Sequence, residues 1–183
     1  MQVNKKILIS EIIGLIFCLA MSFVFHFAYE WLNKTQAIAW LFATNESVWE
    51  HSKIIFYPYF IYSIIEFFIL KPNIKVYLTA KSIPLILSIP VMITLFYTYS
   101  GIIGKNFLAI DIAIAVLIII AKFIISYKIL IKGYFSKYWY LYISISIFIL
   151  IFLIIYTYFP PHINLFYDKT KDIYGINIYN LSW

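Results

Sequence analysis

Apolar residues along this chain gather in five long runs, separated by short polar or turn-forming segments. An α-helix rises about 1.5 Å per residue, so a hydrocarbon core of about 30 Å needs roughly 20 apolar residues. Each run meets that length, and its apolar residues surround the whole helix rather than forming one stripe, as in helices that face lipid. We therefore predict five transmembrane helices, at about residues 7–31, 46–70, 76–99, 107–127 and 138–159.

The segment between the first two runs contains a shorter apolar stretch, from Ala37 to Ala43. It is too short to cross a bilayer, so we expect an interfacial or re-entrant helix there. Thr44 or Asn45 is the expected cap of the helix that follows, because both residue types satisfy free amide groups at a helix start.

A tail follows the fifth run. Pro160 and Pro161 end that run because proline cannot continue a helix. The polar and aromatic mixture of residues 160–183 predicts a lid on the bundle. The predicted fold class is all-α: one transmembrane domain over residues 1–183, with about five spans and the short interfacial or re-entrant helix.

Lysine placement predicts the orientation. With the N-terminus inside, nine lysines lie at the cytoplasmic side and five outside, so the positive-inside rule favours an N-in, C-out topology. The abundance of isoleucine, lysine, tyrosine and asparagine is typical of an AT-rich bacterial genome. Together these features predict a multi-pass protein of the bacterial cytoplasmic (cell) membrane.

Composition narrows the partners. The chain is 64% hydrophobic and only 12% charged, whereas a soluble domain is near half apolar and a quarter charged. The lipid bilayer is therefore the expected surrounding. None of the 14 cationic residues is arginine, which argues against bidentate recognition of nucleic acid, so no nucleic-acid partner is expected.

The predicted topology gathers polar side chains at the extracytoplasmic face. All three histidines and six of the eight carboxylates lie there. Glu11 and Glu66 lie nearer the cytoplasm, where the lysines that could pair with them are Lys6, Lys71, Lys75 and Lys81. Ionisable groups within spans are site candidates because they are costly in lipid. The expected pocket is lined by His26, Glu30, Glu46, Glu50, His51, Tyr97, Asn106, Asp111 and His162.

This polar set suggests three kinds of chemistry. Three histidines with a nearby carboxylate can bind zinc and activate a water molecule. The candidate ligands are His26, His51, His162 and Asp111, with Glu50 or Glu30 as catalytic base. A site for a non-metal ligand or a proton is the second reading, and a structural belt of interfacial side chains is the third. Zinc is the only cofactor that the pattern suggests.

Several runs resemble a family of small, uncharacterised bacterial multi-pass membrane proteins. The most specific is Asn45-Glu46-Ser47-Val48-Trp49-Glu50-His51, accompanied by Phe25-His26-Phe27-Ala28-Tyr29-Glu30-Trp31, Tyr97-Thr98-Tyr99-Ser100-Gly101 and Pro160-Pro161-His162. The resemblance covers nearly the whole chain and implies membrane residence, with no assigned activity or catalytic residues.

Three functions remain open from the sequence. The first is a protein that binds or passes a small solute or lipid through the outer pocket. The second is an intramembrane metal-dependent hydrolase acting on a lipid or lipid-linked substrate, and the third is a structural or assembly subunit. Five spans are an odd number for an inverted-repeat carrier, so a carrier of that type would work as a homo-oligomer.

Overall fold

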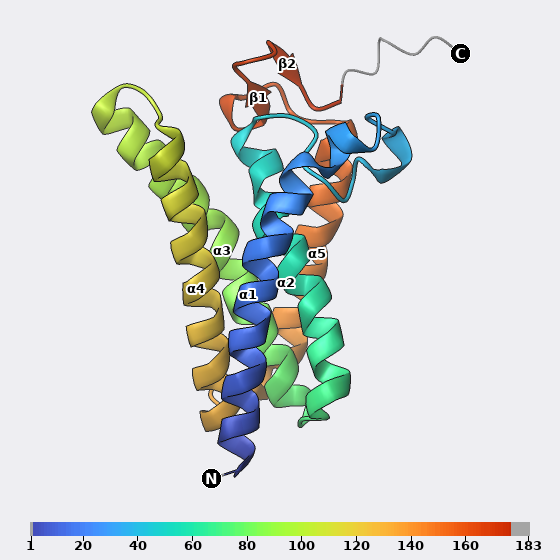
Figure 1. Ribbon diagram of the computed structural model, residues 1–183, viewed down its shortest axis with the longest axis vertical. Helices are drawn as coiled ribbons and strands as arrows, with labels where there is room; N and C mark the ends of the chain where they lie inside the picture. Colours follow the sequence, from blue (N-terminus) through green and yellow to red (C-terminus); the bar gives the residue numbers. More distant parts are fainter. Residues whose placement is uncertain (1, 177–183) are drawn as a thin grey trace.

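Five long helices form an elongated bundle in the computed structural model, which describes residues 2–176 (Figure 1). Each is long and apolar enough to cross a membrane, as the sequence predicted. The odd number of helices places the N-terminus at one end, called here the lower end, and the tail at the opposite, upper end (Figure 1). The helices are α1 (Gln2–Trp31), α2 (Val48–Leu70), α3 (Ile74–Ile103), α4 (Leu108–Lys132) and α5 (Trp139–Tyr158).

The start of α2 differs from the prediction. Ser47 caps this helix, and its hydroxyl accepts a hydrogen bond from the Glu50 amide at 3.3 Å. The expected caps were wrong because both side chains have other partners. The Thr44 hydroxyl donates to the Glu50 carboxylate, and the Asn45 side-chain oxygen accepts from the Ser47 amide.

The segment between α1 and α2 is mostly turns, so the predicted interfacial or re-entrant helix is reduced to the 3₁₀ turn η1 (Gln36–Ile38). Backbone groups of this segment form hydrogen bonds with α1 and α2. The oxygens of Ala39 and Phe42 accept hydrogen bonds from the Lys53 ammonium, and the Ala43 amide donates to the Phe25 carbonyl. These bonds hold the segment against the upper ends of α1 and α2 instead of leaving it free to continue as a helix.

The core lies around α2, whose middle is enclosed by the other helices. Phe56, Tyr57 and Tyr59 are almost fully buried. The first helix approaches closely at Gly14, where an added Cβ would lie 2.2 Å from the Tyr62 ring. Large apolar side chains remain exposed around the outside of the bundle, as expected for surfaces that contact lipid chains.

Pro58 lies within α2, and neighbouring helices supply the hydrogen bonds that it disrupts. Proline removes the bond to the carbonyl four residues earlier, which here belongs to Ile54. The Ser22 hydroxyl of α1 donates to this oxygen at 2.7 Å. The Lys122 side chain of α4 donates to the adjacent carbonyl of Ile55. The carbonyl freed by Pro58 therefore links α2 to α1, and the neighbouring Ile55 carbonyl links α2 to α4.

The tail packs over the upper end of the bundle, in agreement with the predicted lid (Figure 1). The turn η3 (Asn164–Phe166) places Phe166 against Trp49, with ring centroids 5.0 Å apart. A short antiparallel pair follows, β1 (Tyr167–Asp168) with β2 (Ile173–Tyr174). Residues 177–183 of the predicted tail lie outside the described part of the chain.

The N-in orientation stays a prediction. Some of the lysines on which it was based are not loop charges, because Lys53, Lys81 and Lys122 are buried inside the bundle. These buried lysines come from both predicted sides and no longer count as loop charges. The remaining lysines are still more numerous on the predicted cytoplasmic side.

Candidate functional site

The loop before α2 is fixed by the tail. The Glu46 amide donates to a carboxylate oxygen of Asp168 at 2.9 Å, and the Asn45 side-chain amide donates to the Gly175 carbonyl at 3.0 Å. Burial alone would raise the pKa of Asp168. The amides of Glu46, Thr170 and Lys171 and the Thr170 hydroxyl outweigh it and hold that pKa below its ordinary value. An ionised Asp168 therefore positions the loop.

Two histidines and one glutamate converge beside this loop. His26 comes from α1, His51 from the first turn of α2, and Glu46 from the loop between them. The two imidazole rings have centroids 5.1 Å apart. Nε2 of His51 lies 3.5 Å from one Glu46 oxygen, and Nε2 of His26 lies 4.0 Å from the other. One ligand atom from each residue falls within 4.8 Å of the others.

The backbone orients His51. Its Nδ1 lies 2.8 Å from the Ser47 carbonyl oxygen, which can only accept a hydrogen bond, so Nδ1 carries the proton. In a neutral ring Nε2 then has the free lone pair, and it faces Glu46. A carbonyl that holds one ring nitrogen while the other faces a ligand site is the usual support for a metal-binding histidine.

The arrangement favours a positive charge between His51 and Glu46. A free lone pair on His51 and a carboxylate 3.5 Å away repel each other unless a positive charge lies between them. Either a proton on the ring or a metal ion supplies that charge. The side chains are also accessible, with exposed fractions of 23% for His26, 30% for His51 and 44% for Glu46.

Glu50, a predicted catalytic candidate, lies in a separate buried ion pair. One of its oxygens accepts from the Lys53 ammonium at 2.7 Å and from both the amide and the hydroxyl of Thr44 at 2.8 Å. Thr157 of α5 donates to the other oxygen at 3.4 Å. Both charged side chains are almost inaccessible to solvent, so this pair joins α2 to the preceding loop and α5.

The other predicted pocket residues at this end do not join the histidine pair. Glu30, the second catalytic candidate, is exposed and lies 3.6 Å from the Lys171 ammonium. His162 stacks on the Tyr174 ring of the tail, with centroids 4.6 Å apart.

The hairpin of α3 and α4 leans away from the rest of the upper end (Figure 1). Tyr97 lies in α3, Asp111 in the first turn of α4, and Asn106 in the connection between these helices. Asp111 accepts hydrogen bonds from the Tyr99 hydroxyl and, at 3.1 Å, from the Asn106 amide. The Tyr99 oxygen in turn accepts from the Phe107 amide. These bonds close the helical hairpin on itself, so Asp111 has a local structural role.

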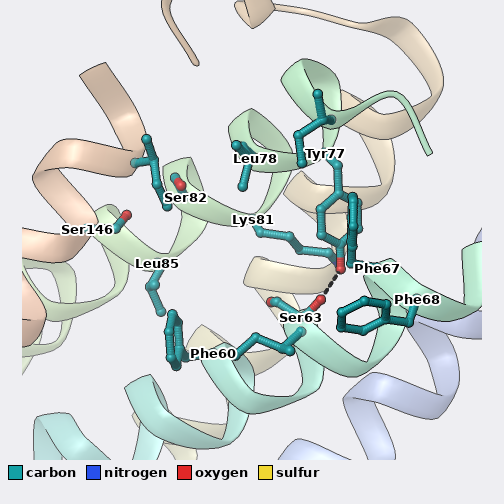
Figure 2. A pocket seen from close by; sticks show the side chains of 13 residues that line it. Phe60, Ser63, Phe67, Phe68, Tyr77, Leu78, Lys81, Ser82, Leu85 and Ser146 are labelled. Carbon is teal, nitrogen blue, oxygen red and sulfur yellow. Dashed lines mark hydrogen bonds between the residues drawn. The ribbon is translucent and has the colours of Figure 1, made fainter. Parts of the chain in front are cut away.

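A cavity of about 240 Å³ lies elsewhere, between α2, α3 and α5 (Figure 2). Its walls are mainly apolar, with Phe60, Phe67 and Leu85 among them. The Lys81 side chain and the Tyr77 hydroxyl reach its wall, and that hydroxyl is hydrogen-bonded to the Ser63 carbonyl (Figure 2). The sequence did not predict this cavity, because its walls depend on how α5, which is distant in the chain, packs against the consecutive helices α2 and α3.

The role of Asp168 was also missed. The sequence marked it only as one of several outer carboxylates, and its contact with Glu46 joins positions 122 residues apart. No local pattern carries such a signal.

Comparison with known proteins gives a family and no activity. No curated protein and no solved structure matches the chain. A family profile described as a family of unknown function (DUF6512) matches residues 1–176. The chain therefore belongs to this uncharacterised family.

Proposed function

We propose that this protein binds a divalent transition-metal ion, with zinc as the expected ion, at the upper end of its membrane-spanning bundle. The ligands are Nε2 of His26, Nε2 of His51 and a carboxylate oxygen of Glu46. The small solute expected from the sequence is then the metal ion itself. The observation that carries the proposal is the convergence of these three ligand atoms within 4.8 Å.

The distances suit a site that closes on its ion. Zinc binds histidine nitrogen and carboxylate oxygen at 2.0–2.2 Å, so neighbouring ligands around a tetrahedral ion lie roughly 3.4 Å apart. The His51 to Glu46 distance of 3.5 Å already has this value, and the His26 to Glu46 distance of 4.0 Å is slightly larger. The two distances are to different oxygens of Glu46, and the ligand atoms lie up to 4.8 Å apart, so binding one ion requires Glu46 to turn and the ligand atoms to draw together. Glu46 lies in a loop and is partly exposed, which leaves its side chain free to turn.

A direct binding experiment tests the proposal. The protein is purified in detergent, stripped with a chelator and titrated with Zn²⁺ against a chromophoric competitor, and Co²⁺ absorption reports the coordination geometry. We expect one equivalent of metal per chain. His51→Ala and Glu46→Gln should each weaken binding by at least about a hundredfold, since even second-shell changes cost 10–100-fold.

His162→Ala is the matched control. It removes the histidine that stacks on Tyr174 outside the cluster, so binding should be unchanged. Absence of saturable binding to the native protein would overturn the proposal. Equal losses in the His51 and His162 variants would overturn it too, because they would show that the cluster is not the site.

A metal-dependent hydrolase is the second candidate, and the number of ligands favours it. Three protein ligands leave a fourth position for water, the pattern of catalytic rather than structural zinc sites. Glu30 is the remaining candidate base from the sequence, since Glu50 is held in its buried pair with Lys53. Turnover of lipid-phosphate or lipid-ester analogues by the zinc-loaded protein, lost in His51→Ala, would support hydrolysis. Metal binding without turnover would leave binding as the function.

A further inference from the structure

A second polar network lies inside the lower half of the bundle, far along α1 and α2 from the histidine cluster. The Lys81 ammonium of α3 lies 2.9 Å from a Glu11 oxygen of α1 and 2.5 Å from a Glu66 oxygen of α2. The Ser126 hydroxyl of α4 donates to the same Glu11 oxygen at 2.7 Å. Side chains of four helices therefore meet in one network. Of the four lysines that the sequence offered as partners of the two glutamates, Lys81 is the one that pairs with both.

The charges of this network do not balance if both glutamates are ionised. Two carboxylates share one ammonium, and all three side chains are at least 94% inaccessible. A net charge in a hydrocarbon-embedded bundle is costly unless it is neutralised. One additional proton on the carboxylates makes the network neutral.

Hydrogen bonds identify where that proton is needed. The Tyr77 hydroxyl lies 2.5 Å from the Ser63 carbonyl and 3.0 Å from a Glu66 oxygen, yet it has a single proton to donate. Donation to the nearer carbonyl leaves two oxygens facing each other with no proton between them. Among residues 2–176, the other Glu66 oxygen has no hydrogen-bond partner.

Lys81 contacts one oxygen of each glutamate, and the two differ in their second donor. Glu11 receives the Ser126 hydroxyl, whereas the Tyr77 hydroxyl beside Glu66 is shared with the Ser63 carbonyl. The second oxygen of Glu11, like that of Glu66, lacks a partner within the described part of the chain. A proton on Glu66 turns one acceptor into a donor and leaves the negative charge on Glu11.

The other titratable groups around the network do not supply the missing charge. The Lys122 side chain donates to the Ile55 carbonyl and lies over the Tyr59 ring, and within the described residues it forms no ion pair with Glu11 or Glu66. The remaining neighbours are neutral in their ordinary state: the thiol of Cys18 and the hydroxyls of Tyr59, Tyr62 and Tyr77.

We propose that Glu66, paired with Glu11 across Lys81, is a reversible proton-binding site inside the bundle. Its ligand is a single proton. Lys81 and Tyr77 of this network also lie in the wall of the cavity between α2, α3 and α5 (Figure 2). Release of the proton leaves a net negative charge at the junction of four helices and favours an arrangement that admits water or a cation. This inference does not rest on the proposed metal site, since the two share no residue.

Infrared spectroscopy of the protein in lipid vesicles tests the proposal. A protonated carboxyl group has a C=O stretching band that a carboxylate lacks. At about pH 7 the native protein should show this band, and it should fall as the pH is raised. Glu66→Gln should remove the band because the site is gone. Glu11→Gln should remove it because Glu66 must then ionise to balance Lys81.

Glu30→Gln is the matched control, since Glu30 is an exposed carboxylate at the other end of the molecule. It should leave the band unchanged. The proposal would be overturned if the native protein, Glu66→Gln and Glu11→Gln gave identical spectra in the region of the carboxyl C=O band from about pH 5 to 9. That result would leave the metal titration unaffected, so the two proposals fail separately.

Stability provides a second readout. A neutral Glu66 predicts that Glu66→Gln changes the unfolding midpoint little, because glutamine also is uncharged. The double variant Glu11→Gln and Glu66→Gln leaves the Lys81 ammonium without a counter-ion, so it should lose much more than the sum of the two single changes. A large loss in Glu66→Gln alone would contradict a protonated Glu66.

Discussion

Replacing Lys53 with methionine removes the counter-ion of a buried carboxylate. The lysine side chain is fully inaccessible, and its ammonium donates to Glu50 at 2.7 Å and to the carbonyls of Ala39 and Phe42 at 2.8 and 3.1 Å. Breaking a buried ion pair by removing one partner costs about 3–5 kcal/mol. The two carbonyls also lose their donor, at about 1 kcal/mol or more each unless water reaches them. We expect the free energy of unfolding to fall by about 5–7 kcal/mol, the sum of these losses.

A double-mutant cycle isolates the ionic part of this loss. Glu50→Gln removes the charge but keeps an oxygen that accepts from Thr44. The double variant, which combines it with Lys53→Met, should therefore lose about 2 kcal/mol less stability than the two single variants lose in total. Unfolding is measured by titrating mixed micelles with sodium dodecyl sulfate and following helicity by circular dichroism. Lys169→Met, at an exposed lysine, should change stability by less than about 0.5 kcal/mol.

Two results would refute this reasoning. A loss below about 1 kcal/mol for Lys53→Met would mean that the pair contributes no more than a surface salt bridge. Strict additivity in the cycle would mean that the charges of Lys53 and Glu50 do not interact in the folded bundle.

Two further predictions concern packing and pH. Gly14→Ala places a methyl group 2.2 Å from the Tyr62 ring and 2.6 Å from the Phe123 ring, so the same unfolding assay should show a loss of about 1–3 kcal/mol. Gly101→Ala, which meets nothing within 4 Å, should be neutral or slightly stabilising, and a similar loss there would contradict a steric cause. The lowered pKa of Asp168 stabilises the docked tail above the unfolded pKa of about 3.9, and this stability is lost as the pH falls through the lower, folded value. Limited proteolysis of the tail should accelerate at that pH in the native protein, whereas Asp168→Asn should be cleaved faster already at neutral pH.

The five helices could be predicted because their signal is local. Each run contains enough apolar residues to cross a bilayer, and in lipid a helix is the structure that pairs all backbone groups within one segment. The segment after Leu32 was harder to predict. Its apolar residues suggested a helix, but the carbonyls of Ala39 and Phe42 serve the Lys53 ammonium, and that contact spans more than ten residues.

In the candidate site too, the local sequence predicted part of the arrangement and the packing of the helices decided the rest. The topology predicted from the sequence placed most ionisable side chains at one end of the bundle, and His26, Glu46 and His51 were among them. It could not separate these from Asp111 and His162, because the separation depends on how α3 and α4 lean and on where the tail docks. Two residues at the same end of a bundle can lie together or far apart, depending on helix rotation and tilt.

The sequence by itself determined the number of spans, the family and the concentration of ionisable residues at one end, since these follow from composition and from the order of residues along the chain. Only the tertiary structure decided which charges meet. In it the imidazole rings of His26 and His51 lie side by side, and Glu50 forms an ion pair with Lys53. Glu11 and Glu66 both form ion pairs with Lys81. The physical reason is that an ion pair or a metal site requires atoms within a few ångströms, and side-chain packing between helices sets such distances.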